Sequence, residues 1–527
     1  MKRVAVVLLI VAAAFASFAA ADTDGKRWWS YVEALANDSM QGRQTGSPEH
    51  RRAAEYVADR FKEAGLAPAG VNGYLQPVKF DVRKIVESQS SLELIRNGKP
   101  ERLSLGEDAV IALRNNPADS VEAPLVFAGY GLSIPEMKFD DFAGLDVKGK
   151  IVVTITGGPS SVPGNLRAHY GYSTERGKFL EQAGAIGLVT IQNPSSADVP
   201  WVRSSLARLE ESMSLTDPAL VDMKNIRITV TVNAAHADKW LTGSGHAIAE
   251  LLKLADAGQP LPHFPLKASL RARVKLERRQ VESQNVVAAL PGTDSKLKDD
   301  YVVLSAHLDH VGVGEPIKGD PIYNGAMDDA SGVASLVEIA RRLQESKTML
   351  RRSLLFVVVT GEEKGLLGSR YFAAHPTVDA TRMIADLNMD MFLPLYPMRL
   401  LTVYGLGESD LGADVRKVAA SMKVDVQDDP APQRNVFVRS DQYNFIRRGV
   451  PAVMIAFGSR KGSPEEAIEK AWLTNRYHAP SDDLGQPVDL AAAAAYNQFM
   501  AALATMTAND SARPQWKPES FFRRFTP

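Results

Sequence analysis

The stretch spanning residues 354–368 restricts the possible folds of this chain more than any other part of its sequence. Residues 354–360 form an unbroken apolar run rich in β-branched side chains, which is typical of a parallel strand buried on both faces. Two adjacent carboxylates, Glu362 and Glu363, follow this run. Ligands of open α/β sheets bind outside the carboxyl ends of the strands. The pair therefore indicates either part of a site at the sheet edge or two acids in a solvated loop.

Similar apolar runs alternate with helical segments in the second half of the chain. The candidate strands cover residues 284–290, 301–306, 354–360, 384–389 and 450–457. Between them, residues 331–343 carry apolar side chains at helical spacing, so that Val333, Leu336 and Ala340 share one face. This alternation predicts an α/β fold with a mostly parallel sheet flanked by helices.

Two other candidate strands also end in side chains that can bind a metal ion. His307 follows the strand at 301–306 and can supply a ring nitrogen to a cation. Asp309 can accept the other ring N–H and so fix the orientation of the imidazole. Asp390 follows the strand at 384–389. We therefore expect three strands to bring metal-binding groups to one edge of the sheet.

Two further residues complete the candidate set. Asp328 lies among small residues at the entry to the predicted helix, and its two carboxylate oxygens can bridge two cations. His478 lies in a loop near the C-terminus, directly after Tyr477. Taken singly, each of these residues fits a cap, a buried histidine or a solvated acid better than a ligand. Taken together, five ligand types in this order on one sheet indicate a metal site.

As a set, these motifs resemble the co-catalytic zinc aminopeptidase family, which includes bacterial leucine aminopeptidases and glutamate carboxypeptidase-like, glutaminyl-cyclase-like and transferrin-receptor-like proteins. The resemblance covers residues 284–484. It consists of His-x-Asp, Asp-Asp-x-Ser-Gly, Glu-Glu-x-Gly-x-x-Gly-Ser, Asp-Met and Tyr-His in this order. It implies a zinc-exopeptidase-like fold and the hydrolysis of peptides with two bound zinc ions.

The resemblance also implies a role for each residue. The predicted metal ligands are His307, Asp328, Glu363, Asp390 and His478, with Asp328 shared between the two zinc ions. Glu362 would be the general base, Asp309 would orient His307, and the peptide bond between Asp328 and Asp329 would be cis. Tyr477 is either a hydrogen-bond donor to the tetrahedral oxyanion or a packing tyrosine.

Three positions depart from the pattern of the family. Ser440-Asp441-Gln442 occupies a stretch where the family often has Ser-Asp-His, so Gln442 replaces the histidine. We expect this change to alter the wall of the pocket rather than the chemistry. Met327 replaces a frequent acid or asparagine beside the shared aspartate. His310 directly follows Asp309, and we expect a solvated loop histidine rather than an additional ligand.

Residues 121–267 differ in character from the rest of the chain. Their expected strands at 124–131, 150–156 and 185–191 resemble those of the protease-associated domain, an insert of several peptidase and receptor families. An ordinary α/β insertion is the alternative. The predicted organisation is a zinc peptidase domain of residues 22–120 and 268–510, the insert at 121–267 and a C-terminal tail at 511–527.

Residues 1–21 predict a secretory signal peptide. Lys2 and Arg3 precede an apolar run, and small residues lead to Ala21. The run is shorter than the roughly 20 residues that a membrane span needs. We therefore expect a periplasmic or secreted bacterial protein with no membrane anchor after cleavage. The chain has no cysteine and a formal net charge of −1, so a metal would be held by His, Asp and Glu, and no basic excess favours nucleic acid.

Three functions follow from these residues and the resemblance. The leading hypothesis is an aminopeptidase that acts on peptides. A carboxypeptidase of the glutamate carboxypeptidase type is the first alternative, and it would need arginines in its pocket. The available candidates are Arg434, Arg439, Arg447 and Arg448. The second alternative is a non-catalytic receptor-like binding module, which would be expected to lose ligands, whereas this chain keeps all five together with Glu362.

Overall fold

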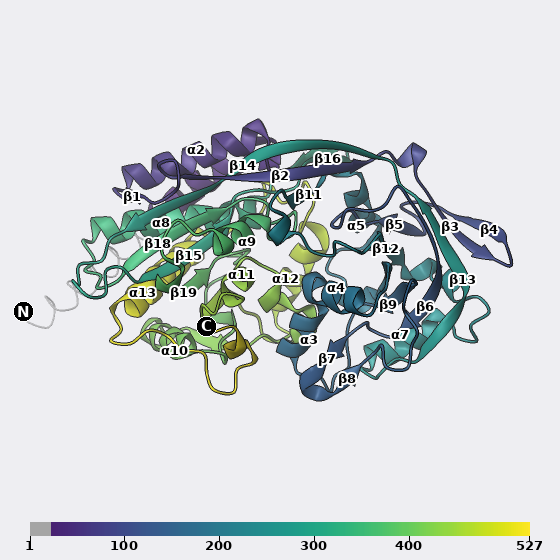
Figure 1. Ribbon diagram of the computed structural model, residues 1–527. Coiled ribbons are helices and arrows are strands. Elements are labelled where there is room, and N and C mark those ends of the chain that lie inside the picture. The colour runs from purple at the N-terminus through teal and green to yellow at the C-terminus, as the bar shows by residue number, and fades with distance from the viewer. Residues whose placement is uncertain (1–22, 527) are drawn as a thin grey trace, which may run out of the picture. The chain divides into compact units, whose positions relative to one another are not determined.

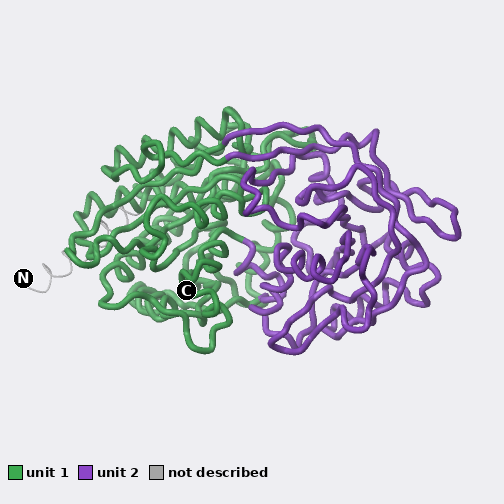
Figure 2. The backbone as a smooth tube through the Cα atoms, in the orientation of Figure 1, with its two compact units in different colours: residues 1–78, 283–430, 440–527 green, residues 79–282, 431–439 purple. Residues whose placement is uncertain are grey.

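A computed structural model describes residues 23–526 of the chain, so the predicted signal peptide lies outside the described residues. The chain forms two compact units (Figure 2). The first consists of the residues up to 78, of 283–430 and of the residues from 440 onward, and the second of residues 79–282 and 431–439. The chain passes from the first unit to the second within strand β2 (Leu75–Ile85) and returns within β14 (Leu276–Leu290).

The sheet of the first unit contains the strand order β14-β18-β15-β19-β22-β20-β21; the first four of these strands are labelled in Figure 1. The strands after β14 are β15 (Tyr301–His307), β18 (Ser353–Val359), β19 (Met383–Asn388), β20 (Leu400–Tyr404), β21 (Asp425–Gln427) and β22 (Ala452–Phe457). β18, β15, β19 and β22 run parallel, whereas β14 pairs antiparallel with β18 and β20 pairs antiparallel with β22. The predicted α/β class with a mostly parallel sheet is confirmed, and β20 and β21 are additions to the predicted strands.

Helices cover both faces of this sheet, as the pattern of β18 requires. All seven residues of β18 are buried. Leu354 and Phe356 belong to one hydrophobic core, and Leu355 and Val357 belong to another. The first core is completed by the helix of residues 23–36, α2 (Pro48–Glu63), α8 (Ser331–Glu345), α10 (Leu411–Met422), α12 (Pro464–Asn475) and α13 (Leu490–Asn509). The second is completed by α9 (Leu367–Ala374) and α11 (Gln442–Ile446).

A tight connection joins the helix of residues 23–36 to α2. It contains the short 3₁₀ helix η1 (Asp38–Arg43), in which Gln41 and Gly42 have positive φ angles. Ser47 caps α2 by accepting a hydrogen bond from the His50 N–H, and Pro48 is the first helical residue, where proline is favoured. The cap fixes the start of α2. Arg43, the last residue of η1, is buried in the interior.

The second unit has its own sheet with the order β4-β3-β13-β6-β9-β10-β12-β5. Its strands are β3 (Ser91–Arg96), β4 (Lys99–Leu103), β5 (Ala109–Ile111), β6 (Ser120–Ala128), β9 (Ile151–Ile155), β10 (Gly187–Gln192), β12 (Ile228–Asn233) and β13 (His263–Arg273). β6, β9, β10 and β12 run parallel, and α3 (Gly164–Gly171) and α4 (Ser173–Gln182) connect β9 to β10. The resemblance of this unit to a protease-associated domain stays a prediction.

The units divide the chain at other positions than the sequence predicts. Residues 79–120 were expected in the peptidase domain, but β3 and β5 pair with β13 and β12 of the second unit. The second unit therefore begins about forty residues before the expected boundary at residue 121. At the other end, residues 511–526 pack into the first unit, where the Trp516 indole N–H donates to the Gly449 carbonyl (2.9 Å).

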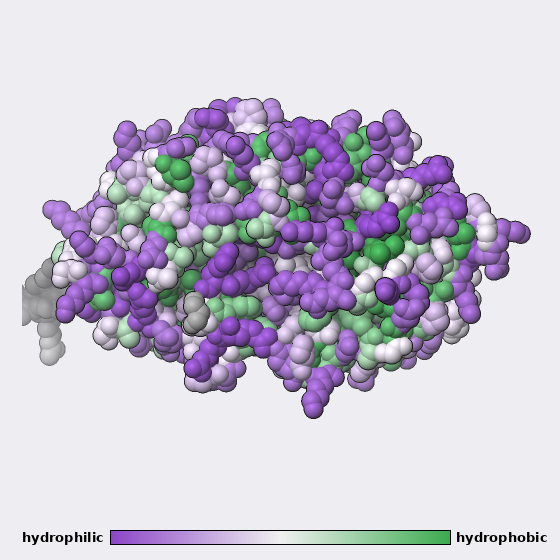
Figure 3. Space-filling model, in the orientation of Figure 1, coloured by the Kyte–Doolittle hydropathy of each residue, from purple (hydrophilic) through white to green (hydrophobic). Residues whose placement is uncertain are grey.

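Among residues 23–526, no helix combines the length and the apolarity needed to cross a membrane. The face drawn in Figure 3 is mostly hydrophilic, and its apolar atoms occur in smaller groups.

Candidate metal centre

The candidate site lies at the carboxyl ends of three neighbouring parallel strands. β15 ends at His307, Glu362 and Glu363 follow β18, and Asp390 follows β19. Because β15 lies between β18 and β19 in the sheet, the three strand ends deliver their side chains to one edge, as expected from the sequence. The loop before α8 adds Asp328, and the loop after α12 adds His478.

The two oxygens of Asp328 face two different groups of side chains. Oδ1 lies 3.2 Å from His307 Nε2, which in turn lies 3.7 Å from Asp390 Oδ1. Oδ2 lies 3.3 Å from His478 Nε2, which lies 3.1 Å from Glu363 Oε2. All five predicted ligands are thus brought together in two groups that share Asp328.

Several polar atoms at the centre are buried without a hydrogen-bond partner among the described residues. They include Asp328 Oδ2, Glu363 Oε1 and Asp390 Oδ1. Buried carboxylate oxygens need a hydrogen-bond donor or a cation. Imidazole and carboxylate donors suit zinc, so the residues present fit a pair of bound zinc ions.

The electrostatics of the cluster agree with this fit. Burial acts to lower the pKa of His307, but Glu362, Asp328 and Asp390 outweigh it and place the pKa well above its usual value. The pKa of His478 is raised in the same way by Glu363. Burial acts to raise the pKa of Glu363, yet His478 and His310 hold it well below its usual value. The Glu363 carboxylate is therefore anionic beside protonated imidazoles. A divalent cation can replace this positive charge when it displaces the imidazole protons.

Asp309 orients His307, but through a different atom from the expected one. The Nδ1–H of His307 donates to the main-chain carbonyl of Asp309 (3.0 Å). The carboxylate of Asp309 instead accepts from Thr45 Oγ1 (2.8 Å) and from the main-chain N–H of Glu362 (3.1 Å). The expected imidazole–carboxylate contact is corrected accordingly, and the buried carboxylate holds the turn that carries Glu362.

Glu362 follows β18 directly before the ligand Glu363, and it is half-buried. Burial raises the pKa of Glu362 well above its usual value; His307 opposes this shift, while Glu363, Asp390 and Asp441 add to it. A carboxylate with a raised pKa takes up a proton more readily, which is the property that a general base needs.

Asp329, which follows the shared ligand Asp328, joins three main-chain segments by hydrogen bonds. The peptide bond between Asp328 and Asp329 is cis, as the resemblance implies. The Asp329 carboxylate accepts from the main-chain N–H groups of His307 (3.2 Å), Gly332 (2.9 Å) and Met391 (3.4 Å). A Cβ on Gly332 would lie 2.5 Å from both Asp329 carboxylate oxygens, so this position has room only for glycine.

Two further side chains support individual ligands. Asp482, in the loop of His478, accepts from the main-chain N–H groups of Met327 (2.9 Å) and Asp328 (3.0 Å). Ser440 Oγ donates to Asp390 Oδ2 (2.5 Å). Neither role was predicted, although Ser440 lies within the Ser-Asp-Gln stretch that the sequence analysis singled out.

Arg43 and Thr45 are the contributors that sequence reasoning missed most completely. Arg43 is fully buried, and its guanidinium donates at 2.7–2.9 Å to four main-chain carbonyls. These belong to Leu35, Leu308, Asn324 and Gly325. Arg43 thus fixes the loop after His307 and the segment before Asp328.

Three remaining expectations have mixed outcomes. His310 was expected to be solvated, but its side chain is 0% exposed and its Nδ1 lies 2.8 Å from Glu363 Oε1, so that expectation is wrong. Gln442 was expected in the pocket wall, but it is buried and accepts from Asn388 Nδ2 (2.8 Å) beneath the strand end. The ring of Tyr477 packs on His478, with centroids 4.0 Å apart, and its role towards an oxyanion stays a prediction.

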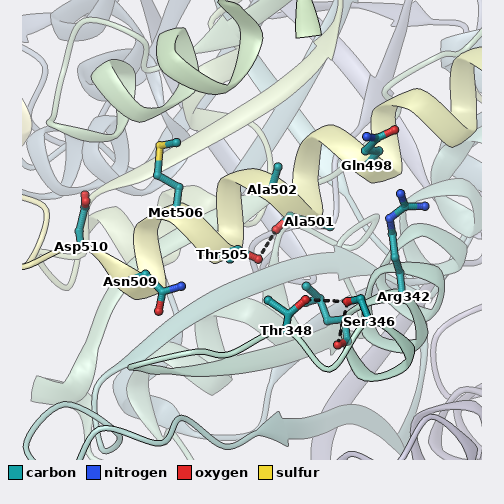
Figure 4. Close-up of a pocket in the computed structure, with 11 residues that line it drawn as sticks. Arg342, Ser346, Thr348, Gln498, Ala501, Ala502, Thr505, Met506, Asn509 and Asp510 are labelled. Atoms are coloured by element: carbon teal, nitrogen blue, oxygen red, sulfur yellow. Dashed lines mark hydrogen bonds between the residues drawn. The ribbon is translucent and has the colours of Figure 1, made fainter. Parts of the chain in front are cut away.

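A separate surface hollow lies between the end of α8 and α13 (Figure 4). Arg342, Thr505 and Asn509 are among its lining residues. None of the residues that line it belongs to the candidate metal centre, so we assign it no part in the chemistry.

Comparison with known proteins agrees with this fold and site. An aminopeptidase from Aneurinibacillus sp. strain AM-1 has a similar structure, with a TM-score of 0.55, 21% sequence identity, and 92% of this chain and 93% of that chain covered. The two chains therefore share a fold. Residues 285–504 match the family model described as "Peptidase family M28". The resemblance seen in the motifs of this stretch is therefore confirmed.

Curated relatives carry the names of two kinds of exopeptidase. The chain is 28% identical over 272 residues to a "probable leucine aminopeptidase 2" of Aspergillus oryzae (strain ATCC 42149 / RIB 40), with 48% of this chain and 50% of the relative covered. It is 24% identical over 365 residues to a "Carboxypeptidase Q" of Bos taurus, with 68% and 64% covered. The chain thus spans half to two thirds of the length of these relatives.

Proposed function

We propose that this chain is a metallo-exopeptidase that removes N-terminal residues from peptides with two bound zinc ions. The observation that carries the proposal is the placement of Asp328 between two groups of ligands, one with His307 and Asp390 and the other with Glu363 and His478. A shared carboxylate between two such groups is suited to a two-metal hydrolytic site.

His307, Asp328 and Asp390 would hold one zinc ion, and Asp328, Glu363 and His478 the other. Bound zinc would lower the pKa of water and polarise the scissile carbonyl. Glu362 would accept the proton of the attacking water and pass it to the departing amine. General acid–base catalysis of this kind contributes typically ~10²–10⁴-fold to the rate. Asp309 would hold Glu362 in place through the Glu362 main-chain N–H.

A carboxypeptidase is the second candidate, because the relative named carboxypeptidase Q matches 68% of the chain. Such an enzyme would use pocket arginines to bind acidic C-termini, but three of the four candidate arginines make other contacts. Arg434 and Arg439 both pair with Asp198 (2.8 Å each) within the second unit. The guanidinium of Arg447 lies over the Tyr443 ring. These contacts favour the aminopeptidase.

A panel of peptides blocked at either end separates the two activities. An aminopeptidase cleaves a peptide amide with a free N-terminus and leaves the N-acetylated peptide intact. Release of the C-terminal residue from the N-acetylated peptide would refute our assignment. A zinc-loaded protein that cleaves none of these peptides would favour the non-catalytic binding module.

Glu362→Gln tests the role of the general base. The variant should bind zinc as the wild type does and lose about 10²–10⁴-fold in kcat, because the amide cannot take up the proton. Glu363→Gln is the contrast, since it should lose zinc together with activity. Near-normal turnover of Glu362→Gln would contradict the mechanism.

We also propose export of the protein, on the pattern of residues 1–21 alone. N-terminal sequencing of protein from the periplasm or medium of a bacterial host should begin at Asp22. Retention of the uncleaved chain in the cytoplasm would contradict this.

A further inference from the structure

His310 occupies a position for which the assignment of metal ligands gives no role. It follows Asp309 in the loop after β15, and its side chain is fully buried against the ligands of the second proposed zinc ion. Its Nδ1 lies 2.8 Å from Glu363 Oε1 and 3.9 Å from Asp328 Oδ2. Ligand atoms of His310, Asp328 and Glu363 all lie within 4.8 Å of one another, close enough for one cation.

The contact between His310 and Glu363 lacks the geometry of a hydrogen bond. Among the described residues, neither ring nitrogen of His310 has a hydrogen-bond partner, and no donor meets Glu363 Oε1 with hydrogen-bond geometry. His310 Nδ1 and Glu363 Oε1 are nevertheless close to each other. Two atoms that bind one tetrahedral zinc ion at about 2.0–2.2 Å lie roughly 3.4 Å apart, and the 2.8 Å between His310 Nδ1 and Glu363 Oε1 is within about 0.6 Å of this. The separation and the missing hydrogen bond together indicate that both atoms point to a common third position.

The ring of His310 has little freedom to turn away from this position. Gly325 has a φ angle of +61°, and a Cβ there would lie 2.4 Å from His310 Cγ. The ring therefore packs directly on the Gly325 backbone. It also lies edge-on to the His478 ring, with centroids 5.8 Å apart, so two imidazoles approach the same carboxylates.

His50 shows what a buried histidine without a metal looks like in this chain. It is 1% exposed, and its Nδ1 lies 3.1 Å from the hydroxyl of Ser283. Burial and the nearby Arg43 lower its pKa to about 3, so it is neutral. His310 differs because its nearest polar neighbours are carboxylates of the metal centre.

We propose that His310 is a sixth side chain of the metal centre and binds, through Nδ1, the zinc ion held by Asp328, Glu363 and His478. This inference rests on the proposed metal centre and adds a ligand to it. The second ion would then have two imidazoles, whereas the first has one. This difference predicts that the second ion is bound more tightly and is removed last by a chelator.

The experiment counts imidazoles at zinc. X-ray absorption of the zinc-loaded wild type should show three imidazoles shared by two ions, and His310→Gln should show two. In parallel, calorimetric titration of the apoprotein with zinc should show at least a ~10–100-fold weaker second ion in His310→Gln. His50→Gln is the matched control, a buried histidine whose loss should leave both the imidazole count and the zinc affinity unchanged.

The outcomes separate the inference from the proposed function. A wild type with two zinc ions and two imidazoles would overturn the role of His310 and leave the proposed metal centre intact. A wild type that binds no zinc would overturn the metal centre itself. If His310→Gln does not fold, the imidazole count of the wild type still decides.

Discussion

Replacing Arg43 by methionine should destabilise the first unit by several kcal/mol and weaken zinc binding at the same time. Burial lowers the pKa of Arg43 to about 10, so the guanidinium stays protonated at neutral pH and donates to four buried main-chain carbonyls. Methionine keeps much of the aliphatic stem but removes the guanidinium donor; the Gly325 carbonyl keeps the Ala330 main-chain N–H (3.3 Å), whereas the carbonyls of Leu35, Leu308 and Asn324 lose the donor that Arg43 supplies. A buried acceptor left unsatisfied costs about 1–3 kcal/mol.

Three such acceptors give a loss of about 3–9 kcal/mol, and we take the lower end because the loops can relax. Even about 3 kcal/mol is a large fraction of the stability of a typical domain, about 5–15 kcal/mol. Two of the carbonyls belong to Leu308 and Gly325, which lie one and three residues from the ligands His307 and Asp328. The apparent zinc affinity should therefore fall together with the free energy of unfolding.

Denaturant unfolding of the apo and the zinc-loaded protein measures both effects. Arg51→Met is the matched control, because Arg51 is 65% exposed and pairs only with Glu55 in the same helix, a contact worth at most about 1 kcal/mol. Arg43→Lys should recover part of the loss, since the ammonium keeps the charge but cannot reach all four carbonyls. A free energy of unfolding for Arg43→Met within about 1 kcal/mol of the wild type would refute this reasoning.

Three further predictions concern metal removal, pH and packing. Chelation should lower the melting temperature and zinc should restore it, because a ligand at 100 times its Kd stabilises the native state by about 2.7 kcal/mol; an unchanged melting curve would count against the site. Burial acts to raise the pKa of Asp300, but Arg513 and Arg382 hold it below its usual value, so its stabilisation is present above about pH 4 and is lost as the pH falls through its lower native pKa. Asp300→Asn should reduce this loss in acid unfolding curves, and substitution of its exposed neighbour Asp299 should not. Gly332→Ala should abolish zinc binding because its Cβ would lie 2.4 Å from the Met389 carbonyl oxygen, whereas Gly407→Ala, with open space around it, should bind zinc normally in the same titration.

The sequence was most informative where burial and chain direction act together. β18 is fully buried and carries an unbroken apolar run, and β15 and β19 are buried apart from Tyr301; parallel strands place their carboxyl ends at one edge. These two facts were enough to predict where His307, Glu363 and Asp390 meet. The short edge strand β21 escaped prediction because Asp425 is exposed and the segment has no apolar run.

The roles of Arg43, Asp329 and Asp309 were missed for a common physical reason, which is that their partners are main-chain atoms. Arg43 binds four carbonyls and Asp329 binds three N–H groups, and main-chain groups are the same in every sequence. The choice of the carbonyl of Asp309 rather than its carboxylate as the partner of His307 is likewise a matter of loop geometry. His310 was misjudged because its neighbours, Glu363 and Gly325, are distant in sequence.

The complete burial of β18 makes the chain sensitive to insertions and deletions at this point. Successive residues of the strand face opposite cores, so one residue more or fewer would send every later side chain to the wrong face. It would also displace the two glutamates along the strand direction by roughly 3.3 Å, more than the bond between zinc and a carboxylate oxygen. Changes of length should therefore be tolerated far better in the exposed hairpin around Asn97 and Gly98 than between Ser353 and Glu363.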